Sequence, residues 1–423
     1  MIRMLTTPLF SKTFFSRKKI VIIGLFGIAN VLLFVLWLAM GAVPGEVRDA
    51  RSSEELPEIQ ELQDTNRNFG ELSGYFSALA ENKGGGYAFA VLRAVELPPN
   101  IDTHLLGHVV GDILYKQKGL EGINVCTHDF RNACSHSIVV GLFNEFGEGA
   151  LDDIAAACRQ APGGKGAYTM CFHGLGHGVL AFVEYEMPDA IALCEKTGTA
   201  LYQNREYIEC VGGTVMEMMA GVHDPELWRE KSKKYFRQDD PLYPCTSDFM
   251  PDEARETCYM YLTPHLLEYV GGNPEHFTTA NFRDAFALCD KADQRRLQLA
   301  CKASFGKEFI GLIKNRDIRD VANLSEEEAR TMYEWCLLAG DRAGSAACID
   351  SAMASLYWGG ENDRSGAVRF CGVVDDGEFQ TICFNNLIGA VQYYVHDRAY
   401  YESFCSELPS AYTSACKERL LQN

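Results

Sequence analysis

Residues 284–313, DAFALCDKADQRRLQLACKASFGKEFIGLI, contain the pattern that decides the fold. Apolar residues at helical spacing lead to Cys289, a polar segment follows, and a second apolar stretch begins at Cys301. Two helices joined by a short connection form a hairpin, and two cysteines that flank the connection can hold the helix ends together. This segment therefore predicts one helical hairpin closed by one disulfide.

The same arrangement recurs along the chain, and strand-like alternation is scarce. In chain order the 16 cysteines form eight pairs: Cys126/Cys134, Cys158/Cys171, Cys194/Cys210, Cys245/Cys258, Cys289/Cys301, Cys336/Cys348, Cys371/Cys383 and Cys405/Cys416. The spacing between successive pairs falls in the period range of helical-hairpin repeats. We therefore expect an all-α fold, an α-solenoid of disulfide-stapled hairpins over residues 71–423, in which residues 71–95 form the N-terminal capping hairpin.

Cysteine usage also indicates the compartment. The number of cysteines is even, and none precedes Cys126. Disulfides form and persist in oxidising compartments. The chain has neither the CxxC knuckles of a zinc ribbon nor a CxxCH motif for covalent haem. The cysteines therefore predict structural disulfides in a domain outside the cytoplasm.

Residues 20–40, IVIIGLFGIANVLLFVLWLAM, have no charged side chain and the length of one transmembrane helix. A cleaved signal peptide is the alternative, but its apolar run is usually ~7–15 residues. Basic residues precede this segment and acidic residues follow it. The positive-inside rule then predicts a cytoplasmic basic tail (1–19), a polar spacer (41–70) and a large C-terminal domain in the periplasm or extracellular space, anchored in the cell (inner) membrane.

The charge distribution restricts the partners. The formal net charge is −18, and the first 45 residues carry five bases and no acid, which leaves 34 basic against 57 acidic residues after them. Such a surface repels phosphate backbones, so nucleic acid is excluded. We expect the membrane as one partner and a protein partner on the solenoid surface as another.

Histidines recur when the repeats are aligned on their second cysteine. The aligned segments are DTHLLGHVVGDIL (102–114), CSHSIVVGLF (134–143), CFHGLGHGVL (171–180) and CVGGTVMEMM (210–219). Residues four apart share one helix face, and packed helices lie ~8–10 Å apart. The His-rich units, about residues 100–220, therefore predict one cluster made of His104, His108, His136, His173 and His177. The plain repeats, about residues 221–423, do not continue it.

Glu217 is acidic within the apolar stretch TVMEMMAG. A buried charge needs a partner, so Glu217 is expected to be a metal ligand, an orienting partner of an imidazole or a general base. A salt bridge to an arginine is the alternative. The other five histidines, His128, His223, His265, His276 and His396, are interpreted as structural or exposed.

His173 and His177 are accompanied by Gly174, Gly176 and Gly178. These glycines indicate that another group approaches the helix closely. Glycine is unfavourable in a helix interior by ~1 kcal/mol, so a run of it needs a reason. The reason is either a neighbouring helix or a bound metal or ligand.

The paired cysteines over about residues 100–423 resemble, in architecture, the cysteine-rich Sel-like and tetratricopeptide-like secreted repeat proteins, in which paired cysteines close each helical hairpin. The series HxxxH, CxH, CxHGxGHG and CxxGxxME also looks like bacterial membrane-anchored proteins of unassigned activity, which implies no function.

The leading hypothesis is a histidine-rich site for a transition metal, Zn, Cu or Fe, with non-covalent haem as a further option. Its ligands would be His104, His108, His136, His173, His177 and Glu217, and metal-dependent catalysis would need an open coordination position. The alternative is a disulfide-stabilised interaction scaffold in which the histidines only pack. The sequence names neither a catalytic residue nor a substrate.

Overall fold

The computed structural model describes residues 56–63, 65–98, 101–127, 129–160, 164–221, 223–272, 276–314, 323–359, 364–395 and 397–422. These residues form helices and no β-strand, which confirms the all-α prediction. The chain divides into Met1–Leu56 and Pro57–Asn423, and the helices below belong to the second unit. The predicted basic tail, transmembrane helix 20–40 and first part of the spacer lie outside the described residues. Within the described part, no helix is long and apolar enough to cross a membrane.

The α-helices follow one another along the second unit with short 3₁₀ segments between some of them. Their bounds are α2 Pro57–Leu62, α3 Phe69–Lys83, α4 Gly85–Ala94, α5 Thr103–Lys118, α6 Ala133–Phe146, α7 Leu151–Cys158, α8 Gly164–Phe182, α9 Met187–Glu195, α10 Arg205–Ala220, α11 Pro225–Lys231, α12 Asp252–Tyr259, α13 Thr263–Tyr269, α14 Thr279–Cys289, α15 Arg295–Ile313, α16 Glu326–Cys336, α17 Arg342–Gly359, α18 Arg364–Val373, α19 Gly377–Tyr394, α20 Arg398–Glu407 and α21 Ser410–Leu421.

Helices α3 and α4 form the hairpin expected near the N-terminus of the domain. Asn68 caps α3 with a capping box to Glu71. The preceding helix, α2, begins inside the segment predicted as a spacer, and its Leu62 is fully buried. Because α2 also contacts α4, the last part of that segment belongs to the helical unit.

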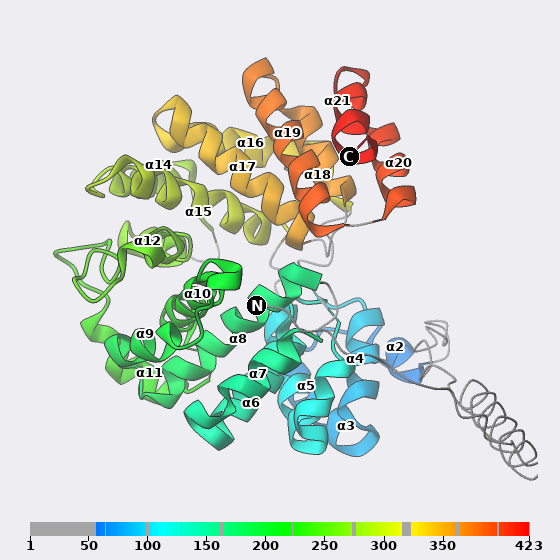
Figure 1. Cartoon of the computed structure of the whole chain (residues 1–423), viewed down its shortest axis with the longest axis vertical. Helices are drawn as coiled ribbons and strands as arrows, with labels where there is room; N and C mark the ends of the chain where they lie inside the picture. The colour runs from blue at the N-terminus through cyan, green and yellow to red at the C-terminus, as the bar shows by residue number, and fades with distance from the viewer. Residues whose placement is uncertain are drawn as a thin grey trace, which may run out of the picture. The chain divides into compact units, whose positions relative to one another are not determined.

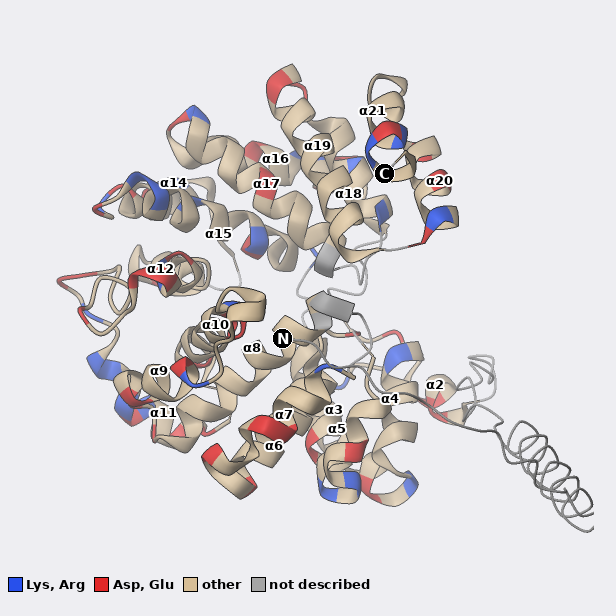
Figure 2. Cartoon of the chain, viewed as in Figure 1, with Lys and Arg blue, Asp and Glu red and all other residues tan. Residues whose placement is uncertain are grey.

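Successive hairpins pack side by side in chain order. One helix of each contacts the next, through α5, α6, α8 and α10, and then through α12, α15, α17 and α19. Figure 1 shows this order as a steady progression of colour through the unit. Helix α19 also contacts α8, so a C-terminal hairpin touches the histidine-bearing part. In Figure 2 the charged residues lie mainly toward the outer ends of the hairpins.

All eight predicted disulfides are present, each between the cysteines of one pair. Their Cα–Cα distances lie between 5.4 and 5.7 Å, within the range that a disulfide requires. Cys289, for example, is the last residue of α14, and its partner Cys301 lies in the second turn of α15. This bridge therefore joins two helices beside their connection, whereas Cys126 and Cys245 of two other bridges lie in segments outside the helices.

Two glycines let the inner helices pack backbone to backbone. A Cβ added at Gly176 on α8 would lie 2.0 Å from the Cys210 carbonyl oxygen of α10. A Cβ at Gly306 on α15 would lie 2.1 Å from the Cys348 carbonyl oxygen of α17. Both glycines stand five residues after the second cysteine of their hairpin. The equivalence shows a repeated packing contact, and no larger residue fits it.

The neighbouring helices account for the glycines around the histidines of α8. A Cβ at Gly174 would lie 2.5 Å from Cδ2 of His136 on α6, and one at Gly178 would lie 3.0 Å from Val140 on the same helix. Of the two explanations given by the sequence, close helix packing is therefore the one observed. The packing also presses the rings of α6 and α8 together.

Candidate metal centre

Four packed helices bring all six predicted site residues together. His104 and His108 come from α5, His136 from α6, His173 and His177 from α8, and Glu217 from α10. Ring centroids lie 4.7 Å apart for His104 and His108, 5.7 Å for His108 and His136, and 6.1 Å for His136 and His177. His108, His136, His173 and His177 are between 1% and 5% exposed, and Glu217 is fully buried.

The sequence interpretation of His223 as structural or exposed is wrong, because this residue joins the cluster. Its ring centroid lies 5.8 Å from that of His108 and 5.9 Å from that of His177. Gly221, with φ of +63°, ends α10 in the left-handed conformation and turns the chain back. The glycine at the helix end, followed closely by a histidine, was the signal available in the sequence.

The remaining histidines differ in their surroundings. His265 is buried and stacks on Phe236 with ring centroids 4.8 Å apart, and His276 is exposed. Both agree with a structural or surface role. His128 and His396 lie outside the described residues.

The donor atoms fall into two groups of three whose members lie within 4.8 Å of one another. The first group is His104, His108 and His136, and the second is His177, Glu217 and His223. His173 belongs to neither group. Its Nε2 lies 3.4 Å from Sδ of Met216, and its Nδ1 lies 3.4 Å from the hydroxyl of Tyr261.

Hydrogen bonds determine which ring nitrogens of α5 are free. His104 Nδ1 lies 2.6 Å from the Phe130 carbonyl, which can only accept, so this nitrogen carries the proton. His108 Nδ1 lies 3.1 Å from Oγ of Ser137, and when that hydroxyl donates to the His108 carbonyl at 3.0 Å, it accepts from the ring. In this hydrogen-bonding pattern the lone pair of both neutral imidazoles is on Nε2.

These two lone pairs face each other. The Nε2 atoms of His104 and His108 are 3.2 Å apart. Without a cation between them, two acceptors at this distance in a buried site repel each other. Two nitrogens bound to one metal at ~2.0–2.1 Å are about 2.9–3.4 Å apart for coordination angles between square and tetrahedral. The pair is thus set at the separation of two ligands of one ion.

His136 adds two further ring nitrogens that are available to a metal ion. Neither of its ring nitrogens has a hydrogen-bond partner in the described part of the chain, although the ring is 1% exposed. The Met170 carbonyl is close enough to raise the pKa of His136 but lies outside hydrogen-bonding geometry. Buried polar atoms without partners are rare and costly. A metal ion between His136 and the α5 histidines would satisfy one of them.

Glu217 accepts four hydrogen bonds and orients two imidazoles. Its Oε1 accepts from the Tyr185 hydroxyl (2.8 Å) and the His223 backbone N–H (3.0 Å). Its Oε2 lies 3.1 Å from Nδ1 of His177 and 2.9 Å from Nδ1 of His223. With Nδ1 donating, Nε2 of His177 keeps its lone pair, and that atom has no hydrogen-bond partner among the residues that the structure describes. This is the carboxylate–histidine arrangement that orients metal ligands.

The partners of Glu217 also decide between the alternatives left by the sequence. They are histidines and a tyrosine, and no ion pair with an arginine is present among the described residues. Burial alone would raise the pKa of Glu217, but His223 and His177 outweigh it and hold the pKa well below its usual range. Glu217 is therefore a carboxylate that fixes ring orientation.

The cluster favours neutral imidazoles. Burial, reinforced by neighbouring histidines, holds the pKa values of His108, His136 and His173 well below the usual range. Burial lowers the pKa of His104 to about 4. Neutral imidazole is the form that binds metals. His223 is the exception, because Glu217 outweighs burial and raises its pKa.

Replacement of Glu217 by glutamine tests its orienting role. In either orientation the amide NH₂ of Glu217→Gln faces groups that donate to the carboxylate, so we expect metal affinity to fall about 10- to 100-fold. The control is Glu206→Gln, because Glu206 is buried on the same helix but accepts from Tyr168 and Thr199, away from the cluster. Metal titration should give unchanged affinity for the control. Equal losses in both variants would contradict the assignment.

Comparisons with protein-family models, with curated proteins and with solved structures found no match for this chain.

Proposed function

We propose that this protein binds at least one transition-metal ion in the imidazole cluster, with His104, His108 and His136 as direct ligands. The single observation that carries the proposal is the pair of Nε2 lone pairs on His104 and His108, held 3.2 Å apart. With both Nδ1 atoms donating, the two lone pairs face each other across this distance. A bound cation converts this repulsion into ligation.

The second group completes the centre in this proposal. Nε2 of His177 is unpaired, and its ring lies 6.2 Å from that of His108 and 6.1 Å from that of His136. His177 therefore supplies a further ligand to the same ion or to a second one. Glu217 holds the rings of His177 and His223 in position and is not required as a ligand.

Ligand chemistry narrows the metal to Zn, Cu or Fe. Imidazole suits these ions, and the disulfides remove thiolate from the donor set. Haem is less well supported, because the described histidine rings pack on one another at centroid distances of 4.7–6.2 Å and do not flank a flat slot.

Metal-dependent catalysis is the second part of the proposal, supported by a cavity of about 140 Å³ lined by His104, His136 and His173. A purely structural metal site is closed, whereas a catalytic one leaves a position for substrate. The scaffold alternative leaves the facing lone pairs without a function. The interaction scaffold is the function that we expect if no metal binds.

The setting of the centre is also proposed. The disulfides favour an oxidising compartment, and the chain-order packing of hairpins favours an α-solenoid akin to the Sel-like and tetratricopeptide-like proteins. Anchorage in the cell membrane by residues 20–40 rests on their apolar composition. A protein partner on the outer surface remains part of the proposal.

Metal content tests this function directly. The full-length protein, stripped with a chelator, would be exposed separately to Zn²⁺, Cu²⁺ and Fe²⁺ and passed through a desalting column. We expect elemental analysis to find one or two ions of at least one metal per chain. Less than a tenth of an ion per chain for all three metals would overturn the metal proposal and favour the scaffold. A haem band in the absorption spectrum of the isolated protein would show that the cofactor is haem and not a bare ion.

A further inference from the structure

Two adjoining cavities lead to the metal centre. The inner one, of about 140 Å³, reaches His104, His136 and His173. The outer one, of about 320 Å³, shares several lining residues with it, among them Arg131 and Lys307. These two cationic residues come from distant parts of the chain and meet only in the folded protein.

Arg131 lines both cavities without an ion-pair partner. The structure gives its side chain no hydrogen bond or ion pair with any described residue. Burial lowers the pKa of Arg131, and the charges of Glu308 and Asp102 oppose that effect without forming an ion pair. A guanidinium with five donors is therefore left facing a cavity.

The backbone also holds Arg131 in an unfavourable conformation. Residues 130–132 all have positive φ, with Arg131 at +53°. This turn directs the Phe130 carbonyl to His104 and places Arg131 beside the same histidine in the cavity wall. Left-handed conformations of non-glycine residues are strained and gather at functional sites.

Lys307 of α15 is the second cation. Its Nζ lies 3.6 Å from the ring centroid of Tyr261, and it makes no ion pair with a described residue. Burial and the charge of Arg131 lower the pKa of Lys307 to about 7. Among the described residues that line the inner cavity, Arg131 and Lys307 are the only lysine, arginine or acidic ones. An anion between them would relieve both the desolvation and the repulsion.

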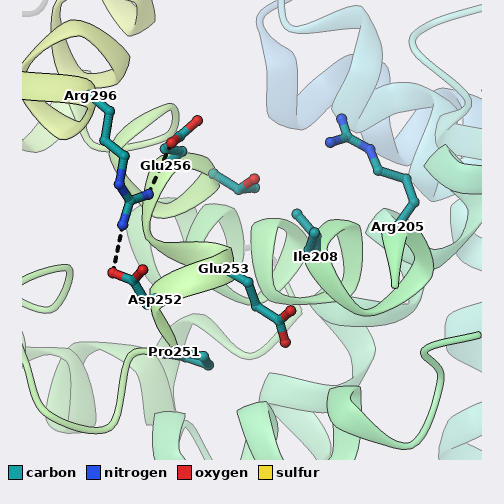
Figure 3. A pocket seen from close by; sticks show the side chains of 8 residues that line it. Arg205, Ile208, Pro251, Asp252, Glu253, Glu256 and Arg296 are labelled. Atoms are coloured by element: carbon teal, nitrogen blue, oxygen red, sulfur yellow. Dashed lines mark hydrogen bonds and ion pairs between the residues drawn. The ribbon is translucent and has the colours of Figure 1, made fainter. Parts of the chain in front are cut away.

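The unpaired state of Arg131 contrasts with the arginines of another cavity. That cavity, of about 650 Å³, is lined by Arg205 and Arg296 together with acidic residues. Figure 3 shows Arg296 bound to both Asp252 and Glu256, at 2.6 and 2.9 Å. Arg205 pairs with Glu209 at 2.7 Å. Those charges are neutralised within the chain, whereas those of Arg131 and Lys307 are not.

We propose that Arg131 and Lys307 bind the oxyanion group, carboxylate or phosphate, of a small substrate in the inner cavity, next to the metal centre. The arginine fork suits two oxygens of such a group, and the lysine adds a point charge. An apolar cavity of ~150 Å³ holds a benzene-sized molecule, so the inner cavity has room for the anionic end of a substrate. The remainder would extend into the outer cavity, whose acidic lining residues Asp102, Glu268 and Glu308 disfavour a second anionic group there.

The inference deepens the proposed function, because it rests on the metal centre for catalysis but not for anion binding. Isothermal titration of the full-length, metal-free protein with inorganic phosphate and with acetate, at constant ionic strength, therefore tests it alone. We expect saturable binding of at least one anion with one site per chain. Arg131→Gln and Lys307→Gln should each weaken binding at least about tenfold, and Lys307→Arg should retain it.

The matched control is Arg296→Gln, which removes an arginine that is already ion-paired. It should bind the anion as the unmodified protein does. No saturable binding of either anion would overturn the inference. So would an affinity in the Arg131→Gln and Lys307→Gln variants equal to that of the unmodified protein. Anion binding without metal binding would overturn the proposed function alone, and metal binding without anion binding would overturn the anion site alone. Circular dichroism would verify that each variant is folded.

Discussion

Full-length protein carrying both His104→Ala and His108→Ala is expected to lose stoichiometric metal. The two substitutions remove the facing Nε2 atoms, which lie 3.2 Å apart, and leave His136 as the only imidazole of the first donor group. Loss of an orienting residue alone costs 10- to 100-fold in affinity, so loss of two direct ligands should cost more than about 1,000-fold. Elemental analysis after desalting, and competition with a chelator, measure this loss.

The same experiment can show that the loss is local. His265→Ala is the control, because His265 is buried like the site histidines but stacks on Phe236 outside the cluster. It should keep its metal. The double variant should retain its helical circular dichroism, because the disulfides remain and the removed lone pairs repel each other. Full metal content in the double variant would show that His104 and His108 are not the ligands.

Gly176→Ala is expected to cause a large loss of stability from a small change. The added methyl carbon would lie 2.0 Å from the Cys210 carbonyl oxygen and 2.8 Å from the Thr214 backbone nitrogen, and backbone atoms cannot move aside as a flexible side chain can. Overpacking of a core costs ~1–3 kcal/mol, so we expect the free energy of unfolding to fall by about 3 kcal/mol. Because α8 and α10 must separate, the distance between His177 and Glu217 should increase and metal affinity should fall too.

Gly311→Ala on α15 is the matched control for this prediction. A Cβ at Gly311 meets nothing within 4 Å, and alanine is favoured over glycine in a helix by 0.5–1 kcal/mol. Chemical denaturation of the oxidised protein, followed by circular dichroism, should therefore rank Gly311→Ala at or above the unmodified chain and Gly176→Ala below it. Equal stability of the two variants would show that α8 and α10 are farther apart than described here.

The hairpins and their disulfides were predictable from sequence because they are local. Cys289 and Cys301 flank one polar connection, and apolar residues at helical spacing continue on both sides. The paired presentation of His104 and His108 is local in the same sense, since residues four apart share a helix face. Repetition of these short patterns then placed the histidines of consecutive hairpins on equivalent faces.

Other properties of the site depend on how distant segments meet. His223 joins the centre only because Gly221 reverses the chain toward Glu217. The free nitrogen of His104 depends on the Phe130 carbonyl, which a left-handed turn directs to its ring. Neither contact has a period or spacing that the sequence could reveal.

By itself, the sequence determined the all-α class, the eight disulfide pairs and the convergence of five histidines, because each follows from contacts within one repeat unit or between neighbouring equivalent units. Only the tertiary structure decided which imidazole nitrogens face one another and that both oxygens of Glu217 accept hydrogen bonds. It also decided that Arg131 and Lys307 line one cavity beside the centre. These depend on ångström-scale packing between helices far apart in the chain, where side-chain orientation is set by partners and not by periodicity.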